Sequence, residues 1–169
     1  MAIMKIFGIA GFKNTGKTTL IVDLVRVLRA RGLRVATIKH AHHEFDIDHP
    51  GKDSFKHREA GAEEVIVASS RRWAHIRELG AGEEPGLQEL LGHLADVDLV
   101  LVEGYKHGDH PKLELRRAGI DTHKLAELDE NIVAIVSDEE IRDEVVAVID
   151  RADIEAIADS VTSNAVDAQ

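Results

Sequence analysis

A strand-like run, a glycine loop and a helical pattern follow one another at the start of the chain. Residues 3–10 are mostly apolar, which is typical of a buried strand. Gly11 to Thr18 then read G-x-x-x-x-G-K-T, and apolar side chains recur at helical spacing in the residues that follow. Glycine at both ends of the loop allows backbone angles that a Cβ forbids, so the loop can wrap round a bound anion. The order of strand, loop and helix therefore predicts a phosphate-binding P-loop.

The P-loop pattern gives individual side chains a role. Lys17 is expected to reach the β- and γ-phosphates, and the Thr18 hydroxyl is expected to complete the shell of a Mg²⁺ ion. Such a loop also uses a carboxylate from a neighbouring strand, and residues 99–103 read as four apolar residues followed by an acid. We favour Glu103 for this role, because ligands collect at the carboxyl ends of strands in open α/β sheets. Asp98 would lie about 16 Å away at the other end.

Strand and helix patterns alternate along the rest of the chain. Strands are expected at about 3–10, 34–39, 64–68, 98–103, 113–116 and 132–136, with 73–76 as the hairpin partner of 64–68. Helices are expected at about 17–31, 52–60, 87–94, 139–149 and 153–161. The alternation predicts a three-layer α/β fold of the P-loop NTPase type, with a largely parallel sheet, helices on both faces and some antiparallel strands. We expect one nucleotide-binding domain over residues 1–161 and a frayed tail over 162–169.

Composition excludes several classes of function. The 169 residues include no cysteine, so disulfides, thiolate metal sites and cysteine nucleophiles are all excluded. The formal net charge of −10 leaves no overall basic surface for nucleic acid. No stretch approaches the length of a membrane span, and the apolar N-terminal run continues directly into the P-loop. We therefore expect a cytoplasmic protein without nucleic-acid or membrane partners.

Residues 39–54 form a second dense group of polar side chains, directly after the second expected strand. Its candidate ligand groups are the donors Lys39, His40 and Lys52 and the carboxylates Asp48 and Asp53, which could bind Mg²⁺ or position a water molecule. With Lys17 and Glu103, Asp48 is a candidate catalytic residue. Three interpretations stay open: a nucleotide-sensing or anion-binding segment, a transition-metal site, and a polar loop whose histidines cap turns. We prefer the first over the metal site, because no H-E-x-x-H pattern fixes a metal geometry.

Three segments together resemble the molybdopterin-guanine dinucleotide biosynthesis protein B family, MobB. They are the P-loop GFKNTGKTTL, the run IKHAHHEFDIDHPGKDSFKHREAGA and the strand and turn DLVLVEGYKHGDHPKLELRR. The middle run is the most specific, because P-loops alone occur in a very large superfamily. The resemblance extends over residues 3–140.

The resemblance implies a dimeric GTP-binding accessory protein with weak GTPase activity. It implies GTP and Mg²⁺ as cofactors, molybdopterin as a further bound ligand, and a partner guanylyltransferase that joins GMP to molybdopterin. The phosphate-binding residues that it implies are Gly11, Lys13, Asn14, Thr15, Gly16, Lys17, Thr18 and Thr19. It further implies Asp48, Lys52 and Asp53 in a second signature, Glu103 and Lys106 in a third, and Asp138 at the base.

The choice of guanine rests on the resemblance rather than on the nucleotide code of general GTPases. The late strand IVAIV ends in Ser137-Asp138 and lacks the lysine of the N/T-K-x-D pattern. Asp138 is either a base contact or an acid that stabilises the N-terminus of a following helix. The arginine pairs at 71–72 and 116–117 are expected to be solvated or salt-bridged rather than catalytic.

Other functions are compatible with the P-loop. One is a metallochaperone GTPase that uses the histidine-rich loop, including His42 and His43. Another is an ATP-dependent small-molecule kinase or ligase, and a third is an interaction module with a vestigial P-loop. If the chain dimerises, we expect the contact at sheet edges or hairpins near residues 64–77.

Overall fold

The computed structural model describes residues 3–41, 45–105, 107–120 and 124–168. Their contacts separate the chain into two compact units, one of Met1–His40 with Leu87–Gln169 and one of Ala41–Gly86. We refer to these as the sheet unit and the hairpin unit. The single nucleotide-binding domain expected over residues 1–161 stays a prediction.

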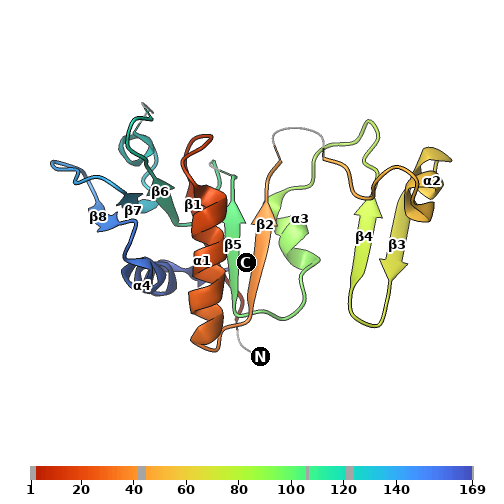
Figure 1. The fold of residues 1–169 in the computed structure, drawn as a ribbon, viewed down its shortest axis with the longest axis horizontal. Helices are drawn as coiled ribbons and strands as arrows, with labels where there is room; N and C mark the ends of the chain where they lie inside the picture. Colours follow the sequence, from red (N-terminus) through yellow and green to blue (C-terminus); the bar gives the residue numbers. More distant parts are fainter. Residues whose placement is uncertain (1–2, 42–44, 106, 121–123, 169) are drawn as a thin grey trace. The chain divides into compact units, whose positions relative to one another are not determined.

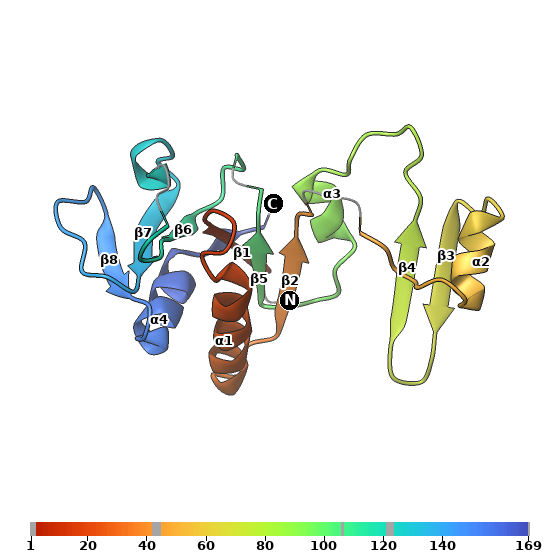
Figure 2. The same cartoon turned by 45° about the horizontal axis from the view of Figure 1, so that its top comes forward.

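A largely parallel sheet forms the centre of the sheet unit (Figure 1). Its strands are β1 (Lys5–Ala10), β2 (Val35–Lys39), β5 (Leu99–Glu103), β6 (Lys112–Leu115), β7 (Ile132–Ser137), β8 (Ala147–Asp150) and β9 (Val166–Asp167). The order is β2-β5-β1-β6-β7-β8, all parallel, and β9 pairs antiparallel with the start of β1. The strands β2 and β5 point to the same rim (Figure 2). Because β1 lies between β5 and β6, the winding of the chain reverses at the carboxyl end of β1, where such sheets bind ligands.

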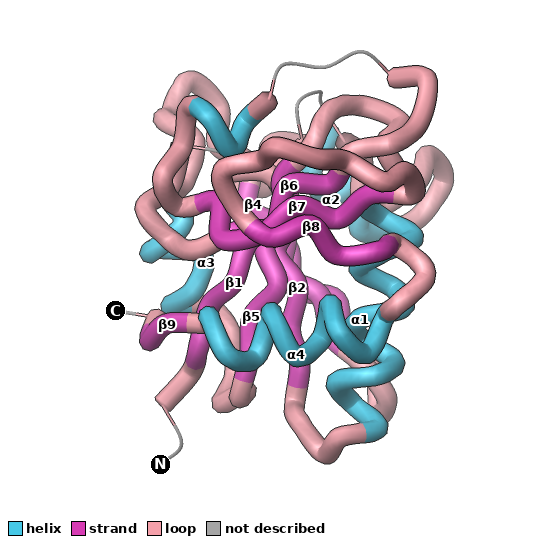
Figure 3. The backbone as a smooth tube through the Cα atoms, turned by 90° about the vertical axis from the view of Figure 1, so that its left-hand side faces the viewer, coloured by secondary structure: helices cyan, strands magenta, loops and turns pink. Residues whose placement is uncertain are grey.

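Helices cover both faces of this sheet, which confirms the expected three-layer α/β architecture. On one face α1 (Lys17–Ala30) and α4 (Ile154–Asn164) pack on alternate strand residues such as Phe7 and Ile9. On the other face α3 (Leu87–Gly92) packs on Ile6 and its neighbours in β2 and β5. Figure 3 shows strands of the sheet between α3 and α1. The short 3-10 helix η1 (Leu125–Glu127) covers the second face beside β7.

The C-terminal part differs from the sequence-based expectation in two places. The helix predicted over residues 139–149 is wrong, because this stretch is irregular and ends in strand β8. Residues 147–150, at the end of a run rich in β-branched side chains, pair with β7, and Asp143 has φ +59°, a left-handed conformation that breaks a helix. Within the predicted tail, residues 162–167 are largely in regular elements: α4 continues to Asn164, and β9 then pairs with Lys5 and Ile6.

The hairpin unit consists of a two-stranded antiparallel sheet and one helix. Its elements are β3 (Glu64–Ala68), β4 (Trp73–Arg77) and α2 (Asp53–Glu59). The register pairs Ala68 with Trp73, which confirms the hairpin expected between 64–68 and 73–76. Within the described part of the chain, no helix combines the length and the apolar character needed to cross a bilayer.

Candidate functional site

The P-loop connects the carboxyl end of β1 to the N-terminus of α1. Gly11 has φ +146° and Gly16, the residue before the helix, has φ +92°. A Cβ on Gly11 would lie 2.8 Å from the Leu115 carbonyl oxygen, so only glycine fits where the loop passes β6. No side chain caps the start of α1, and its first turn contains no acidic residue. This helix end therefore presents N–H groups and a favourable dipole to an anion.

The carbonyl oxygen of Phe12 organises the loop from within. It accepts a hydrogen bond from the Thr15 hydroxyl at 2.9 Å and another from the Lys17 ammonium at 2.6 Å. Thr15 is buried, whereas four of the other residues predicted to contact phosphate are exposed. These exposed residues are Lys13, Asn14, Thr18 and Thr19. Thr15 thus has a structural role in the loop, and the exposed polar groups face solvent.

Glu103 ends β5 beside the P-loop strand, at the position predicted for a metal-binding carboxylate. It is in register with Ile9 of β1 on one side and with Lys39 of β2 on the other. Partial burial lowers the pKa of Lys17, the nearby Glu103 carboxylate opposes this shift, and Lys39 adds to it. Lys17, Lys39 and Glu103 therefore form one charged cluster at the rim. Since the cluster supplies only one carboxylate, Mg²⁺ would depend on phosphate oxygens, the Thr18 hydroxyl and water for its other ligands.

Asp98 has a structural role at the opposite end of the same strand. Its two oxygens accept hydrogen bonds from the Arg34 guanidinium, and Arg34 N–H donates a third. These bonds lower the pKa of Asp98 to about 2. The acid is occupied in joining β2 to β5, which agrees with the choice of Glu103.

The loop after β6 is held by a buried ionic network that sequence reasoning did not identify. Arg116 donates to both Glu114 oxygens, at 3.0 and 2.9 Å, and to Glu144 at 2.7 Å. Glu114 also accepts the backbone N–H groups of Leu125 and Ala126. The signal available in the sequence was Glu114 itself, an acid inside the apolar run of β6. Arg116 is salt-bridged, as expected, rather than available as an arginine finger.

Asp138 follows β7 on the rim and is exposed. Its Oδ1 accepts the Ala118 N–H at 2.8 Å, and its Oδ2 lies 4.0 Å from Arg117 Nε. The side chain therefore positions the 116–118 turn, and no helix follows it. This removes the helix-dipole interpretation, while contact with a base stays a prediction.

The second predicted group lies in the hairpin unit, apart from Lys39 and His40, which belong to the sheet unit. Asp48 accepts hydrogen bonds from the Ser54 hydroxyl and the His49 N–H, and the first of these chiefly lowers the pKa of Asp48. Asp48 thus anchors the start of α2. Lys52 and Asp53 are exposed at the beginning of that helix.

The metal hypothesis gains no support from the described residues. Among them, no three histidine or acidic side chains are grouped so that they could hold a metal ion. His42 and His43, on which the metallochaperone alternative rests, lie outside the described residues, and so does Lys106.

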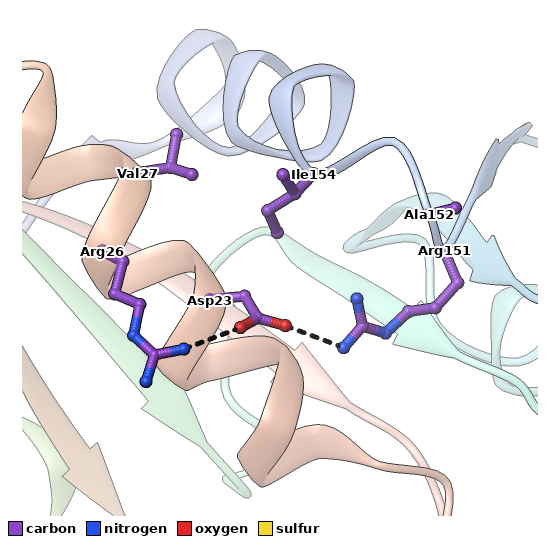
Figure 4. Close-up of a pocket in the computed structure, with 6 residues that line it drawn as sticks. All are labelled: Asp23, Arg26, Val27, Arg151, Ala152 and Ile154. Carbon is purple, nitrogen blue, oxygen red and sulfur yellow. Dashed lines mark hydrogen bonds and ion pairs between the residues drawn. The ribbon is translucent and has the colours of Figure 1, made fainter.

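An open hollow of about 300 Å³ lies along α1 rather than at its N-terminus (Figure 4). Asp23 lies between Arg26 and Arg151, at 3.3 and 3.4 Å. The charges in this hollow are thus paired with one another, and it contains none of the P-loop residues.

Comparison with known proteins decides the family. The family model described as "Molybdopterin guanine dinucleotide synthesis protein B" (MobB) matches residues 6–138, most of the chain. The chain belongs to the MobB family. The match begins in β1 and ends at Asp138, so it includes the P-loop, the hairpin unit and the strand that ends in Glu103.

Relatives in the MobB family cover nearly the whole chain. A molybdopterin-guanine dinucleotide biosynthesis adapter protein from Escherichia coli (strain K12) is 42% identical over 94% of this chain and 92% of its own length. An adapter protein of the same name from Haemophilus influenzae is 41% identical over 78% of this chain and 74% of its own length. A crystal structure of molybdopterin-guanine biosynthesis protein B is 31% identical, covers 94% of this chain and 97% of its own, and superimposes with a TM-score of 0.71. These relatives are not named for metal delivery or for phosphoryl transfer.

Proposed function

We propose that this chain is a nucleotide-binding adapter in molybdopterin-guanine dinucleotide biosynthesis, with GTP and Mg²⁺ as its ligands. The observation that carries the nucleotide part is the P-loop at the reversal point of the sheet, with Glu103 beside Lys17. The adapter part is supported by the names of the relatives and by the family match.

In this proposal each rim residue has a defined task. The N–H groups at the start of α1 and the Lys17 ammonium bind the polyphosphate. Thr18 and Glu103 offer the hydroxyl and carboxylate oxygens that Mg²⁺ prefers. The metal, when bound, neutralises charge on the β- and γ-phosphates. The Lys17 ammonium donates one of its three N–H groups to the Phe12 carbonyl oxygen, which leaves two for a phosphate, and the anion favours its charged form.

Hydrolysis is expected to be slow. A fast P-loop GTPase supplies an arginine to the transition state, worth several orders of magnitude in rate. Arg116 is held between Glu114 and Glu144 and is therefore unable to serve in this way. Slow hydrolysis suits an adapter that binds a nucleotide in order to present or deliver it.

The partners in this proposal are a molybdenum cofactor guanylyltransferase and a second copy of the chain. The first is inferred from the pathway for which the relatives are named, which also makes molybdopterin a candidate ligand. The second is inferred from the hairpin unit, where Ile66 and Trp73 are 65% and 66% exposed. Apolar side chains exposed to this extent on a two-stranded sheet favour a covering surface.

Calorimetric titration with GTP and with ATP in the presence of Mg²⁺ tests the nucleotide assignment. We expect GTP to bind in preference to ATP, and Lys17→Ala to abolish binding. ATP preference would favour the kinase or ligase alternative, and the absence of binding to either would contradict the proposal. The adapter role is tested separately, by whether the protein increases guanine dinucleotide formation by the guanylyltransferase and whether Lys17→Ala removes the increase.

A further inference from the structure

The carboxyl ends of β2 and β5 hold an ion pair that the P-loop motif does not include. Lys39 and Glu103 are the last residues of these strands and are direct register partners. Lys39 Nζ lies 3.8 Å from Glu103 Oε1, and the side chains are 62% and 14% exposed. A largely buried carboxylate is thus approached by a lysine that extends in from solvent.

The backbone around this pair keeps the two strand ends together. His40 N–H donates to the Glu103 carbonyl oxygen at 2.8 Å. Gly104 has φ +97°, and a Cβ there would lie 2.7 Å from His40 Cβ. The two strand ends therefore approach more closely than a side chain at position 104 would allow. The His40 and Tyr105 rings then contact each other, with centroids 5.0 Å apart. The position of Lys39 beside Glu103 is therefore built into the sheet.

Glu103 is ion-paired with Lys39 from β2, and its charge also acts on Lys17 of the P-loop, whose ammonium is hydrogen-bonded to the Phe12 carbonyl oxygen. The three side chains carry one net positive charge next to the open N-terminus of α1. The pair is long, at 3.8 Å, and its lysine is 62% exposed, so solvent screens the attraction and exchanging it costs little. A magnesium-bound polyphosphate presents both a cation for Glu103 and an anion for Lys39.

We propose that Lys39 is a second phosphate-binding lysine, which releases Glu103 to Mg²⁺ and turns its ammonium to the terminal phosphate of the nucleotide. The proposal rests on the nucleotide binding proposed above and makes it more specific. Lys39 approaches the P-loop from β2, on the far side of Glu103, whereas Lys17 belongs to the loop. Lys39 is therefore expected to strengthen the binding of a nucleoside triphosphate more than the binding of a diphosphate.

The test compares Lys39→Met with Lys5→Met by calorimetry with GTP and with GDP in Mg²⁺. Lys5 is a matched control, an exposed lysine at the opposite end of β1. We expect Lys39→Met to weaken GTP binding about tenfold and GDP binding less than twofold, and Lys39→Arg to retain most of the affinity. Lys5→Met should change neither. Equal losses for GTP and GDP, or no loss, would overturn the proposal.

A double variant distinguishes a phosphate contact by Lys39 from a role only as the counter-ion of Glu103. If Lys39 serves only as the counter-ion of Glu103, adding Glu103→Gln to Lys39→Met restores GTP affinity measured without Mg²⁺. If Lys39 contacts the phosphate, the double variant stays about as weak as Lys39→Met under that condition. Failure of the wild type to bind GTP would contradict the proposed function, whereas wild-type binding that Lys39→Met leaves intact contradicts this inference alone.

Discussion

At the scale of single residues, Gly11 is the P-loop position at which a larger side chain is least tolerated. A Cβ there would lie 2.8 Å from the Leu115 carbonyl oxygen and 3.1 Å from Thr15 Oγ1, in a backbone conformation that side chains rarely adopt. Gly11→Ala is expected to destabilise the fold by roughly 1–3 kcal/mol. It should also weaken GTP binding about tenfold, because loop N–H groups move away from the phosphate.

Urea unfolding and calorimetry check both effects, with Gly86→Ala as the control. Gly86 has open space around it and no positive φ, so its replacement should leave stability and binding unchanged. Wild-type nucleotide affinity in Gly11→Ala would mean that the loop N–H groups do not contact the phosphates.

His110 is a buried imidazole that takes the space left by Gly8. A Cβ on Gly8 would lie 2.7 Å from His110 Nε2. Burial lowers the pKa of His110 to about 4, with Lys112 adding to the shift and Asp129 and Asp109 opposing it. The unfolded chain has an ordinary imidazole pKa near 6.5, so it binds a proton between pH 6.5 and 4 that the folded chain does not. Stability from the neutral ring is therefore complete above pH 6.5 and is lost toward pH 4.

Replacing the ring by an amide isolates this contribution. Between pH 7 and pH 4, the wild type should lose roughly 1–3 kcal/mol more unfolding free energy than His110→Asn. Urea midpoints at several pH values measure the difference, and His57→Asn, on an exposed part of α2, is the control. Parallel pH profiles for wild type and His110→Asn would show that His110 is not held neutral.

At the scale of elements, the stretch before α4 shows how tertiary contacts override local propensity. Residues 139–144 are rich in helix-forming acids, yet Glu144 is drawn into the network of Arg116 and Glu114. The Arg116 hydrogen bond chiefly lowers the pKa of Glu144. Sequence periodicity detects neither a distant arginine nor the strand β8 that follows, so the predicted helix was wrong.

The same network predicts a large stability effect from one substitution. Arg116→Met leaves Glu114 and Glu144 buried without their shared cation, which should cost about 3 kcal/mol of unfolding free energy. Arg117→Met is the matched control, because Arg117 is 57% exposed and lies 4.0 Å from Asp138. Its effect should stay within about 0.5 kcal/mol. Urea denaturation measures both, and equal small effects would contradict the role of the network.

A structural feature can be predicted from the sequence when it depends on neighbouring residues. The P-loop and strands β1, β5 and β7 were predictable, because glycine spacing and apolar runs are properties of neighbouring residues. Glu103 was predicted to bind the metal from its place at the end of such a strand, and this role stays a prediction. The role of Asp48 was not, because its hydrogen bond to Ser54 depends on the turn before α2. The two-residue strand β9 is stabilised by its pairing with β1, which no local pattern reveals.

At the scale of the whole molecule, one face of the sheet in the hairpin unit carries large apolar side chains that are exposed. Val65 of β3 is buried, and α2 lies against that strand. Ile66 points to the other face, where it is the register partner of His75, and Trp73 lies on the same face opposite Ala68. The same face carries the charged pair Glu64 and Arg77 at its edge, and a two-stranded sheet is marginally stable alone, so covering Ile66 and Trp73 is favourable. We expect a second copy of the chain to supply the cover.

Sedimentation of Ile66→Glu tests this dimer. The wild type should sediment as a dimer, and the substitution should weaken association about tenfold or more, because it places charge in the centre of the proposed contact. Leu128→Glu is the control, since Leu128 is 80% exposed in the sheet unit and should leave association unchanged. Circular dichroism verifies that both variants are folded. If the wild type is a monomer at micromolar concentration, or if Leu128→Glu weakens association as much, the exposed hairpin face is not the dimer contact.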